Sequence, residues 1–177
     1  MGSRRGSCSC WEAWTPLDKV KPDRIEVLRI PRYVLEATWQ YLQDRGGRQL
    51  EGVVYWTGEA TTAAGVVKHF LVPSAYERES AVHLSVGRDV VFELIRKIHE
   101  LDEFLLARVH SHQEDAFHSW SDDEGCLSGR VGFLSIVVPD FARGPASPDV
   151  WAAYERTSDG QWRHFDRVEL KRRFRVG

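Results

Sequence analysis

Apolar residues recur along this chain at two spacings, and the change of spacing marks the predicted elements. After Pro31, apolar side chains stand three and four positions apart over residues 34–42, which predicts a helix that ends at Gly46-Gly47. Residues 88–101 carry a second stripe of this kind, with charged residues on the other side. Both helices are therefore expected to bury one face against a core.

Short runs rich in β-branched and aromatic residues separate and follow these helices, and they predict strands. Most of these runs are apolar throughout, which is typical of strands that are buried on both faces. Ser158-Asp159-Gly160 predicts a hairpin between the last two strands, whereas the tail 168–176 is open to either helix or strand. The predicted strands are 24–30, 50–58, 64–72, 104–109, 132–139, 150–155 and 161–165.

This mixture of helices and strands indicates an α/β fold. A chain of 177 residues suits one domain with a sizeable core, and we find no internal repeat or linker. Residues 1–22 are rich in Ser, Gly and Arg and are expected to be a flexible N-terminal segment, with residues 23–177 as the single folded domain. No apolar stretch predicts a signal peptide or a membrane span, so a cytoplasmic location is expected.

Charge and cysteine content narrow the function only slightly. The net charge of −2 gives no reason to expect binding to nucleic acid or to a membrane. Three cysteines, Cys8, Cys10 and Cys126, do not make the even set expected of a disulfide framework. Cys126 is interpreted as a small apolar residue, because a nucleophilic thiolate needs a base partner that the sequence does not place.

The candidate chemistry lies where the strand 104–109 ends. His110 and His112 are two positions apart, so both imidazoles point to one face if the strand continues through them. A polar loop follows, and then Ser119 as a predicted helix N-cap and Asp122 in the first helical turn. Two histidines and a carboxylate form the ligand set of a catalytic zinc ion, whose fourth position is left to water.

A zinc site of this kind also needs a general base that takes a proton from the attacking water. Glu51 is the best-placed candidate, because it stands at the start of the mostly apolar strand 50–58. The alternative is that Glu51 is a solvated residue at a strand end. His69, within the strand 64–72, is interpreted as a strand-face histidine with a local hydrogen bond and not as part of the site.

Taken together and in order, these pieces resemble the JAMM (JAB/MPN) metallopeptidases. The pieces are Glu51 with the strand after it, His110-Ser111-His112, and Ser119-Trp120-Ser121-Asp122. The segment 132–141 is similar to bacterial members found with ubiquitin-like conjugation systems. The resemblance covers residues 25 to 165 and implies a cytidine-deaminase-like, three-layer fold with a central mixed sheet flanked by helices.

The resemblance also implies an activity and a role for each site residue. The activity is that of a deubiquitinase-like zinc isopeptidase, which removes or processes a ubiquitin-like protein at its C-terminus. His110, His112 and Asp122 would hold one Zn²⁺ ion, Glu51 would serve as general base, and Ser119 would help to hold the oxyanion. Expected partners are a ubiquitin-like protein or its conjugates, and E1-like and E2-like proteins of the same system.

Two departures from the family pattern concern the loop after the histidines. Gln113 replaces the usual proline, which removes no ligand. The usual count of ten residues after His112 points to Asp123, whereas the Ser-x-x-Asp pairing points to Asp122. We prefer Asp122, because serine and aspartate must reach the metal from one helical turn while a loop tolerates a deletion. Asp123 is the alternative third ligand.

Two other functions compete with the isopeptidase. One is a catalytically inactive MPN-type scaffold that binds ubiquitin-like proteins or partner subunits, although a scaffold has no need of metal ligands. The other is a zinc hydrolase with a small substrate in a narrow pocket. Within the loop, His118 is interpreted as a solvent-exposed histidine and Trp120 as a packing residue at the edge of the cleft.

Overall fold

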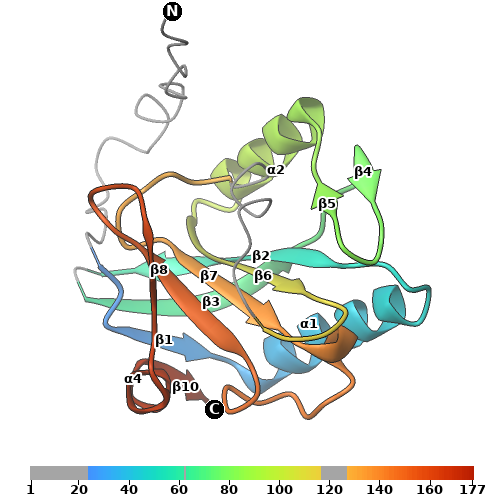
Figure 1. The fold of residues 1–177 in the computed structure, drawn as a ribbon. Coiled ribbons are helices and arrows are strands. Elements are labelled where there is room, and N and C mark those ends of the chain that lie inside the picture. Colours follow the sequence, from blue (N-terminus) through green and yellow to red (C-terminus); the bar gives the residue numbers. More distant parts are fainter. Residues whose placement is uncertain (1–23, 62, 117–126) are drawn as a thin grey trace, which may run out of the picture.

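The fold is built on an eight-stranded mixed sheet (Figure 1). The computed structural model describes residues 24–61, 63–116 and 127–177. Its sheet order is β10-β1-β3-β2-β6-β7-β8-β9, and β4 and β5 form a separate two-stranded hairpin. The strands are β1 (Val27–Ile30), β2 (Val53–Ala60), β3 (Ala64–Leu71), β4 (Arg78–Glu79), β5 (Leu84–Ser85), β6 (Phe104–Ser111), β7 (Leu134–Val138), β8 (Ala152–Arg156), β9 (Trp162–His164) and β10 (Phe174–Val176).

Four helical segments accompany the sheet in the described residues: α1 (Arg32–Gly46), α2 (Arg88–Glu100), the 3₁₀ turn η2 (Asp140–Ala142) and α4 (Arg167–Arg173). Helices α1 and α2 lie on opposite sides of the sheet (Figure 1). Alternate residues of β2 divide between the two sides, because side chains along a strand alternate. Val54 and Trp56 pack in the core with α1, whereas Val53 and Tyr55 pack with Leu94 of α2. The predicted three-layer α/β arrangement is confirmed.

The centre of the sheet combines both strand directions. Strand β2 is antiparallel to β3 and to β6, β6 is parallel to β7, and β7, β8 and β9 are antiparallel. The predicted hairpins 50–72 and 150–165 are therefore confirmed. Strand β6 continues past the predicted end at residue 109 to Ser111, so that His110 is itself a strand residue.

The C-terminal tail contains both of the elements that the sequence left open. Helix α4 is followed directly by β10, which pairs in parallel with β1 at the edge of the sheet. Arg173 at the end of α4 is 2% exposed and donates hydrogen bonds to Glu155 and to the carbonyl of Ile25. The tail thus closes the sheet edge that β1 would otherwise leave open.

Several predictions concern segments outside the described residues. The boundary between the N-terminal segment 1–22 and the domain 23–177 stays a prediction, and so does the helix expected after Ser119. Within residues 24–61, 63–116 and 127–177, no helix combines the length and the apolar character that a membrane crossing requires.

Candidate metal centre

The two histidines of the candidate site lie side by side on strand β6 and its continuation. His110 pairs in register with Val53 of β2 and with Val137 of β7, in the middle of the sheet. His110 is 2% exposed and His112 is 7% exposed. Their ring centroids are 5.1 Å apart. As the spacing predicts, both imidazoles stand on one face, which is the face of Val53 and α2.

The spacing of the two rings fits a shared zinc ion. Zinc bound tetrahedrally at about 2.0 Å from each ligand nitrogen would hold two imidazole centres roughly 5 Å apart. The observed centroid distance is 5.1 Å. Neutral imidazole is a common zinc ligand, and the burial of both rings limits competition from water. The donor chemistry and the geometry of this pair therefore suit the metal that the sequence predicts.

Glu51 lies directly across from His112. The pairing of β2 with β6 continues beyond the last strand residues, because Ser111 N–H donates to the Gly52 carbonyl at 3.0 Å and Gly52 N–H donates to Ser111 Oγ at 3.1 Å. One step further along this register, Glu51 is opposite His112. Alternation from Val53 places Glu51 on the face of the two imidazoles. Glu51 is 7% exposed, so the interpretation as a solvated strand-end residue is wrong.

The backbone of Glu51 is held on both sides. Its N–H donates to the Ser80 carbonyl at 3.0 Å, in the turn of the β4–β5 hairpin. Its carbonyl accepts two hydrogen bonds from Arg45 at the end of α1, from Nε at 3.1 Å and from Nη2 at 2.9 Å. Arg45 Nη2 also contacts Glu79 at 2.8 Å. Charge-assisted hydrogen bonds of this kind are strong, so they hold the backbone from which the Glu51 side chain extends.

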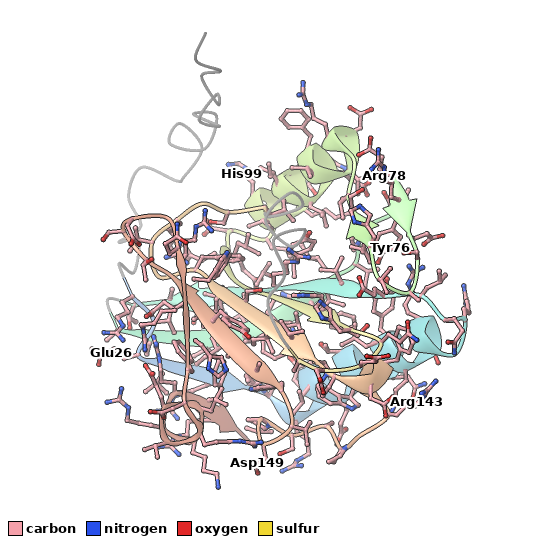
Figure 2. The ribbon with its side chains drawn as sticks, in the orientation of Figure 1. Glu26, Tyr76, Arg78, His99, Arg143 and Asp149 are labelled. Atoms are coloured by element: carbon pink, nitrogen blue, oxygen red, sulfur yellow. The ribbon has the colours of Figure 1, made fainter. Side chains whose placement is uncertain are left out.

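Two tyrosines complete the surroundings of Arg45. The Arg45 guanidinium lies 4.4 Å from the ring centroid of Tyr76, whose hydroxyl is hydrogen-bonded to the hydroxyl of Tyr41. Figure 2 shows Tyr76 beside the β4–β5 hairpin. Burial raises the pKa of Tyr76 and that of Tyr41, so both phenols stay protonated at neutral pH. Arg45 therefore has neutral phenols as neighbours on this side.

A buried arginine on the same face was not predicted as part of the site. Arg108 stands two residues before His110 on β6 and is 3% exposed. It pairs in register with Tyr55 of β2 and Ser135 of β7, which form the next row of the sheet. The strand alternation that placed the histidines would have placed Arg108 on their face. Arg108 thus adds a buried positive charge next to the imidazole pair.

His69, by contrast, lies away from this end of the sheet. Its Nδ1 is 2.8 Å from Glu103 Oε1, and Glu103 Oε2 accepts a hydrogen bond from Thr57 at 2.7 Å. The three residues lie at the far end of β2 from Glu51. The prediction of a strand-face histidine with its own local hydrogen bond is confirmed.

The remaining predicted site residues, Ser119, Asp122 and Asp123, lie outside the described residues, as do His118, Trp120 and Cys126. Within the part of the chain that the structure describes, no group of three His, Cys, Asp or Glu residues is arranged to hold a metal. The third ligand, Asp122 or alternatively Asp123, stays a prediction.

Comparison with known proteins bears on this arrangement. No protein-family model matches the chain. The chain is similar to a protein named probable metalloprotease y4jG from Sinorhizobium fredii (strain NBRC 101917 / NGR234), with 27% identity over 150 residues, 84% of this chain and 93% of the relative. The resemblance to the JAMM (JAB/MPN) metallopeptidases is confirmed.

Two solved structures are similar to this chain in fold. The solution structure of protein DSY2949 from Desulfitobacterium hafniense matches with a TM-score of 0.61 and 14% identity, over 85% of this chain and 93% of that one. The crystal structure of AF2198, a JAB1/MPN domain protein from Archaeoglobus fulgidus, matches with a TM-score of 0.46 and 15% identity, over 85% of this chain and 98% of that one. The predicted α/β fold, with a central mixed sheet flanked by helices, is confirmed.

Proposed function

We propose that this protein is a zinc-dependent peptidase of the JAMM type that removes or processes a ubiquitin-like protein at its C-terminus. The observation that carries the proposal is the pair of buried imidazoles of His110 and His112, 5.1 Å apart, with Glu51 opposite His112. The metalloprotease name of the Sinorhizobium relative supports the same class of reaction. His110 and His112, with Asp122 or alternatively Asp123, would hold one zinc ion.

The chain's own residues would divide the work of peptide-bond hydrolysis among them. Bound zinc supplies a Lewis acid that polarises the scissile carbonyl and lowers the pKa of water. The Glu51 carboxylate takes the proton of the attacking water and delivers it to the leaving amine nitrogen. The Ser119 hydroxyl donates a hydrogen bond to the carbonyl oxygen as that oxygen gains negative charge. The hydrogen bonds from Arg45 and to Ser80 keep Glu51 in place during both proton transfers.

The substrate class rests on the sequence. The segment 132–141, which includes strand β7 next to β6, is similar to bacterial JAMM members found with ubiquitin-like conjugation systems. We therefore propose a ubiquitin-like protein or its conjugates as substrate, and E1-like and E2-like proteins as further partners. An extended C-terminal tail would reach Glu51 past the β4–β5 hairpin, whose Ser80 carbonyl accepts the Glu51 N–H.

Zinc content and cleavage test the proposal together. Purified full-length protein should contain one zinc ion per chain and should cleave a fusion of a ubiquitin-like protein to a reporter at the ubiquitin-like C-terminus. Glu51→Ala should keep its zinc and lose about 10²-fold to 10⁴-fold in turnover, because a general base contributes that much. The exposed Glu77, in the same hairpin region, provides a matched control, since Glu77→Ala should retain full activity.

Each outcome separates the competing functions. Absence of zinc from the purified protein would refute both enzyme functions and leave the MPN-type scaffold. Zinc binding with hydrolysis of small amides but not of the fusion would favour the small-substrate hydrolase. Undiminished cleavage by Glu51→Ala would refute the assignment of Glu51 as the base.

A further inference from the structure

The turn that follows strand β7 has an unusual backbone. Asp140, Phe141 and Ala142 have φ angles of 50°, 50° and 60°, in the left-handed region that side chains other than glycine rarely adopt. They are three of the five non-glycine residues with positive φ in the described part of the chain. Three such residues in a row persist only where surrounding contacts hold them.

The contacts of this turn lead to the second histidine. Phe141 N–H donates to the His112 carbonyl at 2.8 Å, and His112 N–H donates to the Val138 carbonyl at 2.9 Å. Asp140 N–H donates to the Glu114 carbonyl at 2.9 Å. The left-handed conformation thus turns the Phe141 amide back toward β6. His112 lies just past the end of β6, and these bonds fix both sides of its backbone.

The turn is seated on the C-terminal end of helix α1. Phe141 is 1% exposed and Ala142 is fully buried, and Gln43 Nε2 donates to the Ala142 carbonyl at 2.8 Å. A Cβ on Gly46 would come within 2.2 Å of Phe141 Cβ, so the side chain of Phe141 occupies the place that glycine leaves open. Figure 2 shows Arg143, which follows the turn, next to α1.

The neighbouring residue of α1 serves the other half of the site. Arg45 donates two hydrogen bonds to the Glu51 carbonyl, at 3.1 and 2.9 Å. Adjacent residues of one helical turn therefore contact the two opposing segments: Arg45 holds the segment of Glu51, and Gly46 seats the turn that holds His112. Glu51 and His112 face each other across β2 and β6, so this one helix end supports both sides of the pair.

We propose that the C-terminal turn of α1 is the positioning element of the site, with Gly46 setting His112 through Phe141 and Arg45 setting Glu51. None of these three residues is a catalytic residue, because each acts through the backbone of another. The catalytic use of this positioning rests on the proposed function. The positioning of His112 by Gly46 is a property of the fold and can be measured without metal.

Gly46→Ala tests the first half of the proposal. The added methyl group must displace Phe141, so zinc affinity, measured by competition with a chromophoric chelator, should fall by roughly tenfold or more. The Co²⁺-substituted protein should show an altered visible spectrum. Gly47→Ala is the matched control, since the nearest atom to its Cβ would be 3.5 Å away, and it should bind zinc as the wild type does.

A metal-free readout makes the result independent of the proposed function. In zinc-free protein, Gly46→Ala should speed hydrogen exchange of the Phe141 amide and shift the imidazole proton resonances of His112, while Gly47→Ala should do neither. Unchanged exchange and resonances in Gly46→Ala would overturn the proposal whether or not the wild type binds zinc. Absence of zinc from the wild type would refute the proposed function alone.

If Gly46→Ala prevents folding, a second substitution at Phe141 keeps the proposal testable. Phe141→Gly removes the Cβ that the new methyl group would meet, and glycine accepts a positive φ without strain. In the Phe141→Gly background, adding Gly46→Ala should change the exchange and the melting temperature much less than it does in the wild type, because only the backbone carbonyl of residue 141, at 3.1 Å, remains close to the new methyl group. A further loss as large as that caused by Gly46→Ala alone would show that the effect does not pass through Phe141.

Arg45 tests the second half. Arg45→Met should keep zinc affinity, because the side-chain contacts of Arg45 among the described residues, with Glu51, Glu79 and Tyr76, include neither His110 nor His112. It should lower kcat with little change in KM. Arg45→Lys should restore part of the loss, since one ammonium can replace one of the two hydrogen bonds. Arg48→Met, which removes an exposed charge from the same helix end, is the control. Equal kcat for Arg45→Met and wild type would refute this half.

Discussion

Glu51 lies opposite His112 across the antiparallel pair of β2 and β6, one step beyond the reciprocal hydrogen bonds between Gly52 and Ser111. Along the chain, strands β2 and β3, the β4–β5 hairpin, helix α2 and strand β6 lie between the two residues. The sheet brings them together because β2 and β6 are neighbours although they are not consecutive. The proposed base and a proposed ligand therefore lie at the ends of two adjacent strands of one sheet.

The choice between Asp122 and Asp123 as third ligand can be decided by exchange of each for asparagine. Asp122→Asn should lose stoichiometric zinc, because an amide is a weaker zinc ligand than a carboxylate. Asp123→Asn should keep one zinc ion per chain. Zinc content by mass spectrometry under native conditions measures both. The reverse pattern would assign the role to Asp123.

A side chain at Gly52 should destabilise the fold. A Cβ there would lie 3.0 Å from Leu42 Cδ2 and 3.1 Å from Arg45 Cγ, in the contact between α1 and the start of β2. Overpacking at such a contact costs about 1–3 kcal/mol, so Gly52→Ala should unfold at lower urea concentration. It should also lower turnover, because the displaced segment carries Glu51. Equal stability of Gly52→Ala and wild type would show that α1 moves aside freely.

The hydrogen bond between Trp56 and Thr38 should contribute measurably to stability. Trp56 Nε1 donates to Thr38 Oγ1 at 2.9 Å, and both residues are fully buried between α1 and β2. Thr38→Val leaves a buried N–H without an acceptor, which should destabilise the fold by about 1–3 kcal/mol. Thr38→Ser keeps the acceptor and should lose much less. Chemical denaturation of the two variants compares them directly.

Glu155 should make the fold sensitive to acid. Burial raises the pKa of Glu155, but hydrogen bonds from Arg173 and Arg163 outweigh burial and hold the pKa below its usual value of 4.5. A carboxyl whose pKa is lower in the folded state stabilises the fold above the unfolded-state pKa. That contribution is lost as the pH falls below about 4.5 and through the folded-state pKa.

Glu155→Gln should therefore destabilise the protein at pH 7, by about 3 kcal/mol, because it removes the nearer of the two described carboxylates that pair with buried Arg173 and leaves only Glu169, at 3.4 Å. The loss should shrink below pH 4, where the wild-type carboxyl is itself becoming protonated. Urea unfolding of both proteins between pH 3 and 7 measures the difference. The exposed Glu100, on α2, gives the control Glu100→Gln, which should follow the wild type at every pH. A difference that does not change with pH would contradict the role of ionised Glu155.

The local sequence pattern determined the helices, most strands and the candidate residues. The apolar stripes of α1 and α2 and the apolar runs of β2, β6 and β7 carry their own periodicity, so their existence needed no tertiary information. The two-residue spacing of His110 and His112 was enough to place both imidazoles on one face, since strand alternation is a local property. The position of Glu51 at the start of an apolar strand made it the candidate base, and the JAMM resemblance implied the same role.

Only the tertiary structure decided which residues meet and what supports them. No local pattern predicts that β10 pairs with β1 at the edge of the sheet or that Glu51 lies opposite His112. Nor does one predict that Arg45 and Gly46, in one helical turn, contact the segments of Glu51 and His112. Nor does a local pattern predict the left-handed turn at Phe141, because positive φ at a phenylalanine is imposed by its packing against Gly46 and not by its own preference. Propensity and periodicity act over a few neighbours, whereas these contacts join residues tens of positions apart and exist only after the core has formed.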